Sequence, residues 1–102
     1  TAFPPFATIV RVMATGEEEA KVAEVLKAVY SALKELYDAQ PGKFLFFNKM
    51  KAPVKRIQNK FRYQVLMRIT DGALLPLIYE RSLACRARDV LVYVEENPAS
   101  LS

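Results

Sequence analysis

The sequence predicts an α+β fold: a ferredoxin-like βαββαβ arrangement whose four-stranded antiparallel sheet carries two helices on one face. Three observations predict it. A β-branched stretch covers residues 7–13, a helical stripe of apolar residues covers 22–36, and a strictly alternating segment covers 61–69. A second short helix and a last strand complete the order strand, helix, strand, strand, helix, strand, which is the split βαβ motif. Because both helices cover the same face, the other face of the sheet is free to bind a ligand.

The first half of the chain reads as a strand followed by a long helix. Residues 7–13 are the strand. Residues 15–18, Thr-Gly-Glu-Glu, fit a capping box in which the hydroxyl and the last carboxylate satisfy backbone amides at the helix start. The helix then carries an apolar stripe, and Gln40-Pro41-Gly42 ends it. The stripe consists of Val22, Leu26, Val29, Leu33 and Leu36.

The middle of the chain predicts a hairpin with one irregular arm. The apolar run Phe44–Phe47 is typical of a strand that is buried on both faces or nearly so. Residues 48–60 are polar and contain Pro53, so they are a loop or an irregular hairpin arm and not a central strand. Residues 61–69 alternate as the clearest strand in the chain. One face has Phe61, Tyr63, Val65, Met67 and Ile69, and the other has Arg62, Gln64, Leu66 and Arg68.

The last third predicts a short helix and a closing strand. Asp71-Gly72 is a turn or a helix entry, and Pro76 is tolerated only in a first turn, so the helix begins near Leu75 and runs to about Ala87. Residues 90–94 are the last strand, which Asn97-Pro98 terminates. The first strand could add Arg11 to the helix-free face if its register allows.

Length and composition indicate one globular domain over residues 1–102. Apolar residues make up 52% of the chain and charged residues 25%, which is a balance typical of globular proteins. Lys and Arg interrupt every apolar run, so no membrane contact is expected. A single cysteine, Cys85, excludes an internal disulfide framework, and a reducing cytoplasm is the expected location.

The charge of the chain is unevenly distributed. Its formal net charge is +4, but residues 39–70 hold eight basic residues and no acidic one. The eight are Lys43, Lys49, Lys51, Lys55, Arg56, Lys60, Arg62 and Arg68. Such a segment favours contact with a polyanion, although a basic solvated loop would have the same composition.

The residue types that support catalysis or metal binding are missing from the sequence. The chain has no His, so Ser-His and Cys-His nucleophilic pairs are excluded, and Cys85 alone cannot make a zinc site. No phosphate-binding glycine loop is present. We therefore expect no catalytic residues and no metal ligands here. A binding surface remains: cations meet phosphates, while Phe61 and Tyr63 either stack on unpaired bases or belong to the core.

Three stretches of the chain resemble the C-terminal domain of the PriA family, the primosomal protein N′ helicases of bacterial replication restart. Residues 52–67 read Ala-Pro, an aliphatic and a basic residue, a spacer, then the aromatic-Arg-aromatic-Gln pattern of Phe61-Arg62-Tyr63-Gln64 and an aliphatic run. Phe3-Pro4-Pro5-Phe6 resembles the element that follows the motor lobes of that family, and residues 94–98 resemble its closing segment. Residues 1–6 would then be the remnant of a linker from the helicase core.

The resemblance implies a fold similar in topology to ribosomal protein S10 and a parent that is an ATP-dependent 3′-to-5′ DNA helicase. The ATP and zinc sites of that family lie upstream, so no cofactor is expected in this fragment. The implied partners are branched or single-stranded DNA, single-stranded DNA-binding protein, other primosome proteins and the parent's own helicase lobes. The residues expected to contact DNA are Lys55, Arg56, Lys60, Arg62, Gln64 and Arg68.

Two other functions stay open from the sequence. The basic segment could capture the acidic tail of single-stranded DNA-binding protein without touching DNA. Residues 71–75 lack the basic residue expected to meet such a tail, and Arg81, Arg86 or Arg88 could serve instead. An RNA-binding domain of translation is a further alternative, which rests on topology shared with ribosomal proteins alone.

Overall fold

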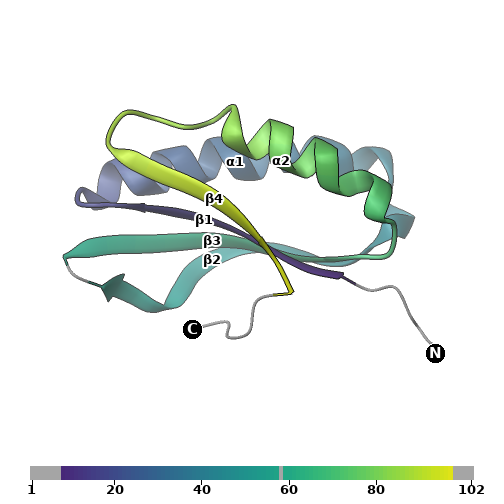
Figure 1. Ribbon diagram of the computed structural model, residues 1–102, viewed down its shortest axis with the longest axis horizontal. Coiled ribbons are helices and arrows are strands. Elements are labelled where there is room, and N and C mark those ends of the chain that lie inside the picture. The colour runs from purple at the N-terminus through teal and green to yellow at the C-terminus, as the bar shows by residue number, and fades with distance from the viewer. Residues whose placement is uncertain (1–7, 58, 98–102) are drawn as a thin grey trace.

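The chain forms a twisted four-stranded antiparallel sheet with both helices on one side (Figure 1). The computed structural model describes residues 8–57 and 59–97, and of residues 51–57 it describes only the backbone. The strands are β1 (Thr8–Gly16), β2 (Phe44–Ile57), β3 (Lys60–Ile69) and β4 (Val90–Glu96), and the helices are α1 (Glu19–Ala39) and α2 (Leu75–Leu83). The strand order is β2-β3-β1-β4. This is the predicted ferredoxin-like arrangement, with β2 and β4 at the edges.

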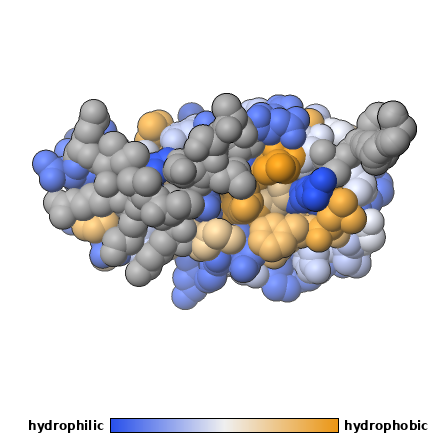
Figure 2. All heavy atoms as spheres, turned by 90° about the horizontal axis from the view of Figure 1, so that it is seen from below, coloured by the Kyte–Doolittle hydropathy of each residue, from blue (hydrophilic) through white to orange (hydrophobic). Residues whose placement is uncertain are grey.

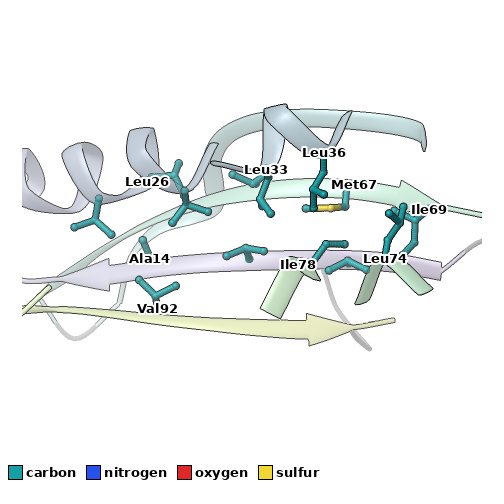
Figure 3. Close-up of a cluster of buried hydrophobic side chains, with 14 of the residues drawn as sticks. Ala14, Leu26, Leu33, Leu36, Met67, Ile69, Leu74, Ile78 and Val92 are labelled. Atoms are coloured by element: carbon teal, nitrogen blue, oxygen red, sulfur yellow. The ribbon is translucent and has the colours of Figure 1, made fainter. Parts of the chain in front are cut away.

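The core lies between the helices and one face of the sheet. All five residues of the predicted stripe on α1 are buried, and they face the residues of β3 that alternate with its polar set. Figure 3 shows side chains of both helices pointing toward those of the strands. The labelled ones are Leu26, Leu33 and Leu36 on α1, Ile78 on α2, Leu74 just before it, and Ala14, Met67, Ile69 and Val92 on the sheet.

The predicted capping box is wrong, because β1 continues through it. Thr15 and Gly16 are the last residues of β1, and α1 begins at Glu19 with Glu18 as its N-cap. The side chain of Glu18 makes no capping hydrogen bond, while its carbonyl oxygen accepts from the amides of Lys21 and Val22, each at 3.1 Å. Strand pairing prevails over the local pattern because Gly16 pairs with both β3 and β4.

The apolar run Phe44–Phe47 is a strand, but it is not buried on both faces. It begins the edge strand β2, and Leu45 and Phe46 are 61% and 43% exposed. The expected irregular arm is present, since β2 runs past Pro53 with its register broken between Lys51 and Arg56. An edge strand tolerates a proline because its outer amides have no partner strand to bond.

The second helix begins where the sequence predicts and ends earlier. The side chain of Asp71 accepts from the amide of Ala73 at 2.9 Å and caps a short 3-10 turn, Gly72–Leu74, and α2 then begins at Leu75. It ends at Leu83, four residues before the predicted Ala87. The last strand runs two residues past the predicted Val94, to Glu96, and Asn97 follows it with φ 46°. Asn97 is tied to β1, because its amide donates to the carbonyl oxygen of Ile9 and its side chain accepts from the Ile9 amide.

Candidate nucleic-acid interface

The face of the sheet opposite the helices carries the polar side chains that the alternation of β3 predicts for it. Antiparallel pairing aligns residues of this face in rows across the strands. One row is Phe46, Arg68 and Ile9, and the next is Asn48, Leu66, Arg11 and Glu95. Arg11 therefore does join this face. Figure 2, seen from below, shows apolar side chains gathered on this side with hydrophilic ones around them.

The six predicted contact residues do not form one exposed patch. Arg68 and Lys60 are exposed, while Arg62 is 9% and Gln64 1% exposed. The side chains of Lys55 and Arg56 lie outside the described residues. Arg62 takes part in further interactions, so changing it would disturb the fold as well as any ligand contact. The structure therefore leaves Arg68 and Lys60 as the described members of the predicted set that a ligand can reach directly.

The helix-free face holds no unpaired carboxylate within the described strands. Glu95 is the acidic residue that they place there, and its Oε1 accepts from Nε of Arg11 at 2.7 Å. Arg11 is 5% exposed, and this ion pair holds its guanidinium in place. Other acidic residues, apart from Glu96, lie on helices or in connections. Among the described residues of this face, Arg68 is therefore an exposed cation, and the carboxylate of Glu95 is paired with the buried Arg11.

Two cations of the basic segment are engaged elsewhere. Nζ of Lys43 lies 2.7 Å from the carboxylate of Asp71, and that contact lowers the pKa of Asp71, helped by the Ala73 amide. Nζ of Lys49 lies 4.9 Å from the ring centroid of Tyr30 on α1, in cation–π geometry. Lys49 therefore lies on the helix side of the sheet and Lys43 at the end of the sheet, and both contacts connect the basic segment to other parts of the fold.

The aromatic residues proposed for stacking belong to the helix side. Phe61 and Tyr63 are partly buried against the core, which is the second of the two roles left open by the sequence. The hydroxyl of Tyr63 donates to the carboxylate of Glu19, and this bond, with burial and the nearby charge, raises the pKa of Tyr63 to about 12. Phe46 and the half-buried Tyr93 are the described aromatic residues that the register places on the helix-free side, and the sequence led us to expect Phe46 in the interior.

An open hollow of about 610 Å³ lies at the end of the sheet where β1 finishes and β4 begins. Lys60, Arg86 and Arg88 line it, and none of them makes an ion pair within residues 8–57 and 59–97. Glu17, Glu18 and Asp89 line it too. Nζ of Lys21 lies 3.2 Å from the carboxylate of Asp89 and 3.3 Å from that of Glu18, while Glu17 makes no ion pair among the described residues. The hollow thus combines three cations that have no ion-pair partner in the described part of the chain with three carboxylates, two of which are paired with Lys21.

The described part of the chain holds a single thiol, that of Cys85, and two α-helices. It contains no group of three or more His, Cys, Asp or Glu side chains that could hold a metal ion. Burial raises the pKa of the Cys85 thiol, which lowers its nucleophilicity near neutral pH. Neither α1 nor α2 combines the length and the apolar character that crossing a membrane requires.

Comparisons with known proteins identify the family. The model of the primosomal protein N C-terminal domain matches residues 1–98, and the chain belongs to that family. No curated protein matches the chain. Two similar solved structures are proteins designed de novo. Foldit4 has 14% identity and a TM-score of 0.64, with 92% of this chain and 99% of that one covered. A designed protein with a ferredoxin fold, LFR1 1, has 18% identity and a TM-score of 0.57, with 92% and 87% covered. At these identities the likeness shows the fold alone.

Proposed function

We propose that this member of the primosomal protein N C-terminal domain family is the DNA- and partner-binding domain of a PriA-type ATP-dependent 3′-to-5′ helicase. Family membership connects the chain to the primosome and to replication restart. The parent would supply ATP hydrolysis and the zinc module from other segments, and this domain would act in the cytoplasm without catalysing a reaction. Its contribution would be contact with branched or single-stranded DNA and with the helicase lobes.

One observation supports DNA contact above the others: the helix-free face has an exposed, unpaired Arg68 and no unpaired carboxylate in its described strands. A phosphate would therefore be attracted at Arg68, while the Glu95 carboxylate on the same face is already paired with Arg11. Contacts of this kind position a nucleic acid but read no sequence. Recognition by the shape of a fork agrees with that property.

The test is fluorescence anisotropy of the chain with a labelled fork, a single strand and a duplex, each at low and moderate salt. Arg68→Gln and Lys60→Gln should each weaken binding to DNA of any sequence. Each should also reduce the slope of log affinity against log salt concentration by about one, the value for one lost phosphate contact. Lys27→Gln is the matched control, since Lys27 is an exposed cation on α1, on the opposite side of the molecule. Equal effects of all three variants would mean that net charge alone drives binding and that the face has no special role.

A second function has its own support in the hollow lined by Lys60, Arg86 and Arg88. These three cations have no ion-pair partner among the described residues, so they would suit a carboxylate-rich segment such as the acidic tail of single-stranded DNA-binding protein. This domain would then act as a protein-interaction module of the primosome. Arg86→Gln with Arg88→Gln should abolish binding of a labelled acidic peptide and leave fork binding unchanged. Loss of fork binding alone in that double variant would assign the hollow to DNA.

A further inference from the structure

We infer that the helix-free face takes an unpaired DNA strand, with one base stacked on Phe46 and a neighbouring phosphate at Arg68. This inference rests on the proposed function and names the form of DNA that the face binds. It assigns a role to Phe46, an aromatic residue that the sequence places in the core and the structure places outside it.

Phe46 stands apart from the other aromatic side chains of its region. Phe44 and Phe47 pack with Tyr30 and Tyr37 of α1 in a cluster with ring centroids 5.1–5.8 Å apart. Phe46 makes no ring contact with that cluster and is 43% exposed. An exposed phenyl ring on a sheet face provides the flat apolar surface on which a base can stack.

A β-bulge puts Phe46 on this face. Phe44 pairs with Ile69 and Phe46 pairs with Arg68, so Leu45 is an extra residue in β2. With regular alternation Phe44 and Phe46 would share a face, and Phe46 would point toward the helices. The bulge reverses its direction while Phe47 still packs against the core. Bulges of this kind commonly re-aim a side chain next to a functional site.

Arg68 is the direct cross-strand neighbour of Phe46. Side chains in such pairs start about 5 Å apart, close enough for one nucleotide to touch both. Arg68 is exposed and makes no ion pair within the described residues. A ring for the base beside a guanidinium for the phosphate is the combination that single-strand binding surfaces use.

The charge of the surroundings selects this occupant over a second copy of the chain. Pairing two β2 edges would bring the basic segments of both copies together, and residues 39–70 contain eight cations and no acid. A polyanion gains from that charge, whereas a second copy is repelled by it. A blunt duplex is also a polyanion, but its bases are stacked on one another inside the double helix, so they cannot stack on Phe46.

The test exploits the absence of tryptophan from the chain. Phe46→Trp introduces a single indole, whose fluorescence should be quenched when a single strand is added and unchanged when a blunt duplex is added. Ser31→Trp is the matched control, because Ser31 is exposed on α1, on the other side of the sheet. Its fluorescence should not respond to either DNA.

Binding measurements complete the test. Phe46→Ala should weaken single-strand binding roughly five- to hundredfold, leave duplex binding nearly unchanged and leave the salt dependence unaltered. Phe46→Tyr should restore single-strand affinity. Equal losses for both DNA forms, or binding that ignores Phe46, would overturn this inference and leave the proposed function standing. If the unmodified chain binds no DNA at all, both fall. A dimer that Phe46→Ala converts to a monomer, without selective loss of single-strand binding, would identify a second copy as the occupant.

Discussion

Gly16 lies at the crowded end of β1, and replacing it with alanine should destabilise the fold. A Cβ added there would stand 2.7 Å from the carbonyl oxygen of Asp89 and 3.1 Å from Cγ2 of Val22. The first distance is shorter than real Cβ contacts allow, and the atom it meets belongs to the backbone. Val22 is fully buried, so it too has little room to move.

The magnitude follows from two opposing effects. Overpacking at a constrained site costs about 1–3 kcal/mol in the free energy of unfolding. Alanine also restricts the unfolded chain, which returns about 0.4–1 kcal/mol. The net loss should be about 1–2 kcal/mol, and each kcal/mol corresponds to roughly 4–8 °C in Tm for a domain of this size.

The assay is thermal unfolding followed by circular dichroism, with urea unfolding as an independent measure of the free energy. Gly42→Ala is the matched control, because a Cβ there would meet nothing within 4 Å and its φ is not positive. That variant should be as stable as the parent or slightly more so. If Gly16→Ala unfolds at the same temperature as Gly42→Ala, the close approach of the α2–β4 connection to β1 is not as rigid as we argue.

Three further predictions concern single side chains. The hydrogen bond to Glu19 raises the pKa of Tyr63 from 10.0 to about 12. The bond therefore stabilises the fold fully below pH 10, and this stabilisation of the fold is lost as the pH rises toward 12. The gap in urea midpoint between the parent and Tyr63→Phe should therefore shrink over that range, and a constant gap would contradict the assignment. Gln64 is 1% exposed, and its Oε1 has no hydrogen-bond partner among the described residues. Its cross-strand neighbours are Met13 and Met50, so Gln64→Met should stabilise the fold by about 1–3 kcal/mol in urea unfolding. A loss of stability there would show that the amide is needed. Cys85, whose thiol pKa burial raises, should react with iodoacetamide more slowly in the native chain than in urea, and equal rates would refute that burial.

The sequence predicts an element correctly where burial against one core sets the periodic pattern of that element's apolar residues. The stripe of α1 and the alternation of β3 are of this kind, since each repeats with the period of its element against a single core. The errors arise where pairing with a strand distant in sequence determines the local structure. Thr15 and Gly16 look like a helix start, but their pairing with β3 and β4 keeps them in a strand.

The site is less predictable because the charge of a side chain does not reveal its partners. Lys43 is neutralised by Asp71, which lies in the connection before α2. Arg62 has the same type and the same face as Arg68, yet it is buried and Arg68 is exposed. Composition therefore identifies the basic segment, while the three-dimensional neighbours decide which of its cations a ligand can reach.

The bulge in β2 connects the fold with the proposed function. Its extra residue, Leu45, lets one short run of apolar residues serve two surfaces, with Phe44 and Phe47 in the core and Phe46 on the opposite face. In a regular strand Phe44 and Phe46 would share the core face, and Leu45 and Phe47 would share the opposite face. Exposing Phe46 and Leu45 on an edge strand is a liability for aggregation, which the surrounding positive charge reduces. The same positive charge would attract DNA, whose bases would cover the ring of Phe46. Solubility and DNA binding therefore both favour positive charge at this edge of the sheet.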